Sequence, residues 1–112
     1  MDTILIEYKI NNGNQIHIFG DDFVKNNENE FTFFVEDKEF DLISNYEIQD
    51  TDNNKLVIEL KINKIKDISS MFHDCSSLLS ISENFSKLDT NHIKDMNSIF
   101  YNCSSLEYLP DI

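Results

Sequence analysis

The chain has 112 residues, of which 40% are hydrophobic, and a formal net charge of −12. This length and composition suit one small domain with a core, and the charge argues against binding to nucleic acid or to an anionic lipid surface. The sequence contains no apolar run approaching the ~20 residues of a membrane span and no secretory signal at its start. These features predict a cytoplasmic protein without membrane insertion.

The negative charge is concentrated in the first part of the chain. Residues 1–60 carry fourteen acidic residues against four lysines, a net charge of −10, whereas residues 61–112 carry seven against five, a net charge of −2. An acidic surface of this kind can attract a basic protein partner, and it can also serve solubility alone. The sequence leaves both interpretations open.

The first predicted element is a strand in "ILIEYKI" at 4–10, where apolar and polar residues alternate. The Asn/Gly cluster that follows predicts a β-hairpin. A three-residue loop keeps the apolar side chains on one face, because it pairs Ile10 with Ile16 and Tyr8 with Ile18.

The acidic segment "DDFVKNNENE" is predicted to be a surface loop with one helical turn. A second hairpin is predicted in "FTFFVEDKEFDL", which follows it. A turn at 37–38 pairs Val35 with Phe40 and Phe33 with Leu42, so one face is apolar throughout. The alternating segment "KLVIELKI" at 55–62 predicts a further strand. Residues 1–63 are therefore expected to form an antiparallel β-meander or half-sandwich.

The second part of the chain repeats a motif. "IKDISSMFHDCSSL" at 65–78 matches "IKDMNSIFYNCSSL" at 93–106, a shift of 28 residues. In each copy the apolar residues are spaced as one stripe of a short helix, after an aspartate that can cap it, and a short strand is expected next. The residues predicted to form the repeat core are Ile68, Met71, Phe72, Cys75, Leu78, Met96, Ile99, Phe100, Cys103 and Leu106.

These two segments resemble BspA-type leucine-rich repeats, which are surface-protein repeats of bacteria and protists. The resemblance covers about residues 65–112, and residues 1–60 are similar to the β-rich leader of some protist members. It implies a right-handed solenoid with a parallel sheet that binds proteins or mediates adhesion. The expected fold is therefore α+β: a β-rich capping domain at 1–63, followed at 64–112 by two short-helix/strand coils, the second incomplete.

We expect a non-catalytic protein-interaction or scaffold module that forms the N-terminal part of a longer repeat protein. We expect a protein partner at the strand face, through Ser80, Glu107 and Tyr108. The alternative is a purely structural piece that caps the solenoid or self-associates through its C-terminal edge at 109–112. If the family analogy holds for a longer protein, the expected location is the cell surface.

The remaining motifs do not predict a chemical site. Cys75 and Cys103 are expected to be buried as small hydrophobic residues, and His73 with two separated cysteines is a poor zinc-ligand set. The segment "DTDNNK" at 50–55 begins like a calcium loop but lacks the glycine and glutamate that such a loop requires. No arrangement typical of a nucleophilic, phosphate-binding or metalloprotease site is present. We therefore predict no enzyme activity, no metal and no cofactor.

Overall fold

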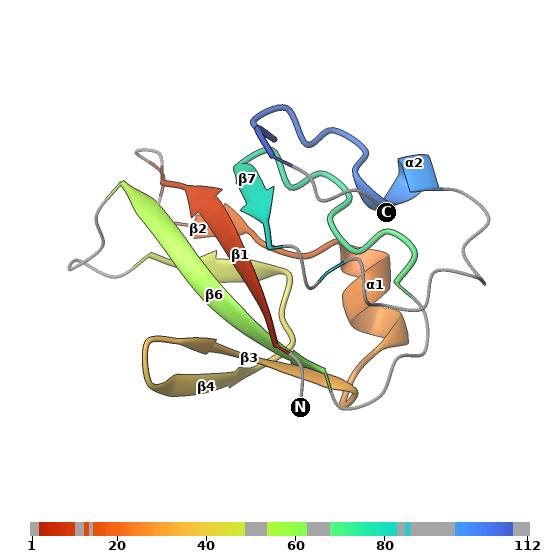
Figure 1. Ribbon diagram of the computed structural model, residues 1–112. Coiled ribbons are helices and arrows are strands. Elements are labelled where there is room, and N and C mark those ends of the chain that lie inside the picture. The colour runs from red at the N-terminus through yellow and green to blue at the C-terminus, as the bar shows by residue number, and fades with distance from the viewer. Residues whose placement is uncertain are drawn as a thin grey trace.

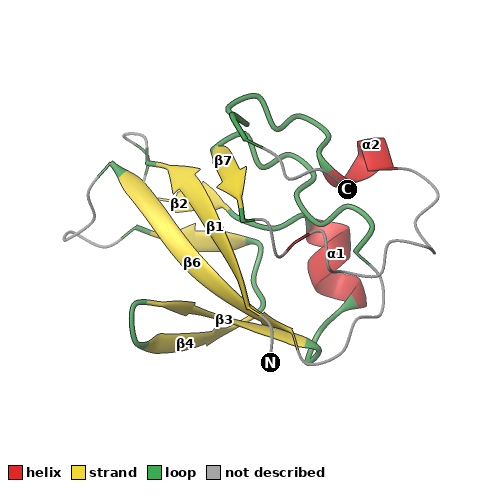
Figure 2. Ribbon diagram, viewed as in Figure 1, coloured by secondary structure: helices red, strands yellow, loops and turns green. Residues whose placement is uncertain are grey.

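The computed structural model of the protein describes residues 3–10, 13, 15–48, 54–62, 68–82, 85 and 96–108. Strands dominate these residues, and both of their α-helices are short (Figure 2). In chain order the elements are β1 (Thr3–Lys9), β2 (Gln15–His17), α1 (Asp21–Asn26), β3 (Phe31–Val35), β4 (Lys38–Asp41), β5 (Asn45–Glu47), β6 (Lys55–Ile62), β7 (Leu78–Ile81) and α2 (Met96–Ile99).

The main sheet has five strands in the order β4-β3-β6-β1-β7, and its strand pairs are antiparallel. A second sheet of two strands pairs β2 with β5. The predicted strand at 55–62 is confirmed as β6, which lies in the middle of the main sheet (Figure 1). Its alternate residues Leu56, Ile58 and Leu60 are buried, as the period of two residues requires.

The predicted hairpin around the Asn/Gly cluster is wrong. β1 pairs with β6 over seven residue pairs, from Thr3↔Lys61 to Lys9↔Lys55, and it pairs with β7 on its other edge. The segment after the cluster forms only the three-residue strand β2, which pairs with β5. The longer β6 offers β1 a matching row of buried side chains over its whole length, and β2 is too short to do so.

The second predicted hairpin is confirmed, but its register differs by two residues. Phe33 lies opposite Phe40 and Val35 opposite Lys38, so the turn is 36–37 rather than 37–38. The rings of Phe33 and Phe40 stack with centroids 5.1 Å apart and planes 8° apart. A shift of two residues keeps every side chain on the same face, so the alternating pattern alone did not distinguish the two registers.

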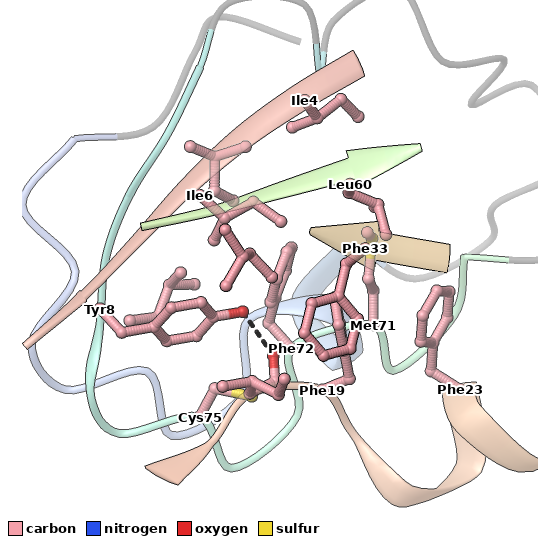
Figure 3. Packing of buried hydrophobic residues seen from close by; sticks show 14 of the residues in the cluster. Ile4, Ile6, Tyr8, Phe19, Phe23, Phe33, Leu60, Met71, Phe72 and Cys75 are labelled. Carbon is pink, nitrogen blue, oxygen red and sulfur yellow. Dashed lines mark hydrogen bonds between the residues drawn. The ribbon is translucent and has the colours of Figure 1, made fainter. Parts of the chain in front are cut away.

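One hydrophobic core joins the two parts of the chain (Figure 3). Phe19 is central in it, with ring centroids 5.6 Å from Phe23, 6.0 Å from Phe33 and 5.9 Å from Phe72. The first copy of the motif therefore packs directly on residues 1–60, which we call the leader. The division between 63 and 64 stays a prediction about the sequence units.

The helix predicted in the first copy is not formed. Residues 68–78 make successive turns in which backbone N–H groups bond to carbonyls three residues earlier, as Met71 does to Ile68 and Cys75 to Phe72. Ser70 and Asp74 have φ angles of 61° and 64°, which interrupt a right-handed helix. Among the described residues of the second copy, 96–106, the α-helix is α2.

The predicted α+β fold with a solenoid is wrong. The described residues form a small β-rich globule of mainly antiparallel sheet, and they contain no solenoid. The strand of the first copy, β7, joins the antiparallel sheet beside β1 instead of starting a parallel sheet. Parallel pairing in the described part of the chain is limited to the bridge between Ser80 and Tyr108.

Candidate functional site

The two copies of the motif lie against each other in register, because residues 28 positions apart are in contact. The rings of Phe72 and Phe100 stack with centroids 5.9 Å apart and planes 14° apart. The rings of His73 and Tyr101 stack at 4.9 Å and 16°. Both pairs consist of residues that are 28 positions apart in the sequence. Equivalent positions of the two copies therefore stack directly on each other.

The next equivalent pair, Asp74 and Asn102, is joined by a hydrogen bond. The Asn102 side-chain amide donates to Asp74 Oδ1 at 2.9 Å. Both residues have left-handed φ angles, 64° and 61°, which Asp and Asn tolerate better than most residues. The Asp74 backbone N–H donates to the carbonyl of Tyr101 at 2.8 Å, which adds a backbone bond to this contact.

The predicted binding residues lie where the strand segments of the two copies meet. Ser80 and Tyr108 form the parallel bridge, and the N–H groups of Glu107 and Tyr108 donate to the carbonyl of Leu79 at 2.8 and 3.2 Å. Ser80 is half-buried, whereas Glu107 and Tyr108 are exposed. Successive residues of an extended chain point to opposite sides, so we expect Ser80 and Tyr108, and not Glu107, to share one face.

This face is the outer face of the main sheet, opposite the core. Ser80 lies beside Glu7 of β1, which in turn lies beside Val57 of β6. Paired residues point to the same side of a sheet, so a row runs from Val57 through Glu7 and Ser80 to Tyr108. Leu5, two residues before Glu7, is on the same face. We call these five residues the outer face.

Three exposed apolar side chains lie on the outer face. In the described part of the chain four large hydrophobic side chains are exposed, and three of them belong to it: Leu5 at 49%, Val57 at 46% and Tyr108 at 47%. Leu5 and Val57 were not predicted as binding residues from the sequence. The available signal was an apolar residue at an outward position of an alternating strand, next to buried neighbours such as Ile6 and Ile58.

The predicted repeat-core residues differ in burial between the copies. In the first copy all five are fully buried or nearly so: Ile68, Met71, Phe72, Cys75 and Leu78. In the second copy Ile99 is buried, but Phe100, Cys103 and Leu106 are only half-buried. The side chain of Met96 lies outside the described residues. The second copy therefore has a less complete core than the first.

Both cysteines are free thiols at equivalent positions of the copies. Burial raises the pKa of the Cys103 thiol to about 11, although a backbone hydrogen bond at Cys75 lowers it. Burial also raises the pKa of Cys75, further than that of Cys103, and the neighbouring Cys103 adds to the effect. The Cys103 thiol donates to the carbonyl of Phe72 at 3.1 Å, which adds a polar contact between the copies.

The described residues contain no group of three His, Cys, Asp or Glu side chains that could hold a metal ion. His73 lies 3.2 Å from the carboxylate of Asp74, with Nδ1 toward Oδ2, and stacks on Tyr101. Most of the segment 50–55 is outside the described residues. No helix among the described residues has the length and apolar character needed to cross a membrane.

These features define a small β-rich protein in which a duplicated motif stacks on itself beside an antiparallel sheet. A family model described as "Mycoplasma protein of unknown function, DUF285" matches residues 32–109. The chain belongs to this family. The family is related to the BspA-like surface proteins, which confirms the resemblance at that level but not the leucine-rich-repeat assignment. No curated protein and no solved structure matches the chain.

Proposed function

We propose that the protein is a non-catalytic interaction module that binds another protein at the outer face. The observation that carries the proposal is that the exposed side chains of Leu5, Val57 and Tyr108 lie on one side of the main sheet. Large apolar side chains that stay exposed together are typical of protein-binding surfaces. The two copies of the motif, which we propose to be BspA-type repeats, contribute Ser80 and Tyr108 to this surface.

The chemistry of the outer face fits a partner with both apolar and basic side chains. Leu5 lies opposite Glu59, and Val57 lies opposite Glu7, so each apolar residue has a carboxylate as its cross-strand neighbour. The net charge of −12 gives the whole protein a field that attracts a basic surface. Apolar contacts would supply affinity, and Glu59 would favour lysine or arginine over acidic side chains, whereas Glu7 already lies 3.4 Å from Nζ of Lys55.

The proposal can be tested by site-specific crosslinking in cells of the source organism. A photoreactive phenylalanine analogue at Val57 or at Tyr108 should give an adduct with the same protein. The same analogue at Glu28, an exposed residue after α1, should give no such adduct. Different adducts from the two outer-face positions, or no adduct from either, would contradict a binding site there.

The captured protein must then be purified and its affinity measured. The double variant Leu5→Ser/Val57→Ser should weaken binding by about tenfold or more, because each change removes apolar contact without adding a charge. Tyr101→Ser is the matched control, since Tyr101 is exposed to a similar degree but lies in a turn of the second copy. Equal affinities for all three proteins would remove the outer face as the binding site.

The location forms part of this proposal. We expect the cytoplasm for this chain alone, and the cell surface if a longer protein carries it there, as in the related surface proteins. Protease treatment of intact cells distinguishes the two, because only a surface protein would be degraded.

A second candidate function is structural, with self-association in place of an outside partner. It is favoured by the incomplete burial of the second copy, where Phe100, Cys103 and Leu106 remain half-buried. This candidate uses a different surface from the outer face.

A further inference from the structure

The second copy exposes apolar surface at positions where the first copy is fully buried. Each buried residue of the first copy has its equivalent 28 residues later in the chain, and the paired side chains are of like type. Phe72, Cys75 and Leu78 are fully buried, whereas their equivalents Phe100, Cys103 and Leu106 are half-buried. Tyr101 is 55% exposed, and its equivalent His73 is half-buried. These equivalents in the second copy are Phe100, Tyr101, Cys103 and Leu106. We call the last four residues the open edge.

The first copy is covered on both of its sides. The second copy lies on one side, through the stacked rings and the hydrogen bonds described above. The leader covers the other side, where the ring of Phe19 stacks on Phe72 and the N–H of Gly20 donates to the carbonyl of Met71 at 2.9 Å. The open edge of one chain therefore cannot reach the first copy of another chain without displacing the leader.

Two backbone groups of the second copy have no backbone partner among the described residues. The Asp74 N–H donates to Tyr101, but the equivalent N–H of Asn102 has no backbone acceptor within the described residues. The carbonyl of Leu79 accepts two N–H groups, but the equivalent carbonyl of Glu107 accepts none from the described backbone. Within the described part of the chain, one donor and one acceptor beside the apolar open edge are therefore without a backbone partner.

The charge distribution favours contact between two copies of this chain at the open edge. Glu107 is the single charged residue in 96–108, whereas 1–60 carries a net charge of −10. Figure 1 shows the second copy, in blue, at the end of the molecule opposite the acidic β3–β4 hairpin. Two chains that meet through their second copies would keep their acidic leaders far apart, which limits repulsion between them.

We propose that a second copy of the chain binds at the open edge and forms a closed two-fold dimer. A two-fold interface uses the same patch on both partners, so each open edge covers the other. The leader blocks a head-to-tail arrangement, and the assembly therefore stops at two chains. Tyr101 is expected to lie near the two-fold axis, with the face of its ring that is not stacked on His73 against the partner. This dimer does not depend on binding at the outer face.

Sedimentation equilibrium from micromolar to millimolar concentrations tests the dimer. We expect a mixture of monomer, with a mass of 13.1 kDa, and a species of twice that mass, with nothing larger. Tyr101→Lys should raise the dissociation constant of the dimer by about tenfold or more, because it puts two positive charges together at the axis. Val57→Lys is the matched control and should leave the dissociation constant unchanged, since Val57 is exposed to a similar degree but lies on β6 in the outer face.

A second measurement needs no variant, which protects the test against a loss of folding in Tyr101→Lys. In the unaltered protein the amide NMR signals of Asn102 and Glu107 should shift with concentration, and that of Val57 should not. A monomer at every concentration would overturn the proposal. A series of species larger than a dimer would overturn the two-fold arrangement. Equal weakening by Val57→Lys would move the interface to the outer face and also overturn it.

Discussion

The hydroxyl of Tyr8 donates a hydrogen bond of 2.6 Å to the backbone carbonyl of Ile18, and both residues are fully buried (Figure 3). The bond crosses the core from β1 to the segment that follows β2. Burial raises the pKa of the Tyr8 phenol well above its ordinary value, so the group remains a donor at physiological pH. The sequence pattern predicted these two residues as hairpin partners, and the structure joins them through a side chain instead.

Replacing Tyr8 by phenylalanine should lower the free energy of unfolding by about 1–3 kcal/mol, because the buried carbonyl of Ile18 would lose its donor. Urea denaturation followed by circular dichroism measures this change. Tyr101→Phe is the control, since its hydroxyl is on an exposed side chain, and should alter stability by less than ~0.5 kcal/mol. If the two variants were equally stable, the Tyr8 bond would contribute nothing to the fold.

Local features of this fold were predictable from the sequence, and long-range pairing was not. Alternation located β1, β3 and β6, since each buries every second residue. It does not say which strand lies beside which, and β1 pairs with β6 from some fifty residues away. β2 is nearer to β1 in the sequence but does not pair with it, because β2 extends over only three residues.

The repeat shows a second limit of sequence reasoning. The shift of 28 residues predicted that equivalent positions would stack, and Phe72 with Phe100 does so. The apolar spacing also predicted a helix in each copy, but left-handed φ angles at Ser70 and Asp74 turn the first copy into successive turns. A stripe of four residues spans about two helical turns, which is too short for periodicity to exclude an irregular loop with the same side buried.

The candidate site was predictable in part. Ser80 and Tyr108 were expected from the strand positions of the motif, and the structure brings them together as a bridge. Leu5 and Val57 were not expected, because single outward apolar residues on a strand are common and carry no signal alone. Their significance depends on the pairing of β1 with β6, which is a long-range feature.

Gly20 is required by a close approach between the leader and the first copy. A Cβ at this position would lie 1.9 Å from the carbonyl oxygen of Ser70, which belongs to the backbone and cannot easily move. Gly20→Ala should therefore lower the free energy of unfolding by about 1–3 kcal/mol or more. Its effect can be measured by thermal unfolding.

Gly13→Ala serves as the control for this substitution. The nearest atom to its Cβ would be the carbonyl oxygen of Gln15 at 3.8 Å, and its φ is not positive. We expect this variant to be unchanged or stabilised by up to ~1 kcal/mol. Similar melting temperatures for the two variants would show that the leader can move away from the first copy.

The β3–β4 turn places a glutamate where glycine is favoured. Glu36 has a φ of 56°, whereas Asp37 does not have a positive φ, which is the pattern of a type II′ turn. Glu36→Gly should raise the free energy of unfolding by roughly 0.5–1 kcal/mol, since relief of left-handed strain exceeds the entropy cost of glycine. Asp37→Gly should not be stabilising. A higher urea midpoint for Asp37→Gly than for Glu36→Gly would refute this account of the turn.

The two thiols should resist alkylation in the folded protein. With a pKa raised from 9.0 to about 11, Cys103 has roughly 100-fold less thiolate at pH 8 than an ordinary cysteine. Iodoacetamide labelling followed by peptide mass spectrometry should show about that reduction relative to the urea-unfolded protein, and Cys75 should react more slowly still. Labelling at the unfolded rate would show that the contact between the two copies opens readily.

The same shift in pKa predicts how stability depends on pH. A thiol with a raised pKa in the folded state holds its proton more tightly there than in the unfolded state. Its contribution is therefore fully present below about pH 9 and is lost as the pH rises toward 11. The variant Cys103→Ser should therefore lose less stability than the unaltered protein as the pH rises from about 9 toward 11. Parallel pH profiles for the two proteins would contradict the shift.

The hydrogen bond between Asp74 and Asn102 allows the contact between the copies to be measured by a double-mutant cycle. Each change to alanine removes the bond and also places alanine at a left-handed φ, so the single variants should lose more than the bond contributes. The backbone cost is the same with and without the partner, so it cancels in the cycle. The remaining coupling energy should be about 0.5–1.5 kcal/mol.

Asp22→Ala combined with Asn102→Ala is the control, because Asp22 lies in α1, and its coupling should be below ~0.5 kcal/mol. Equal coupling in both cycles would mean that the stacked copies do not contact each other through this pair in solution.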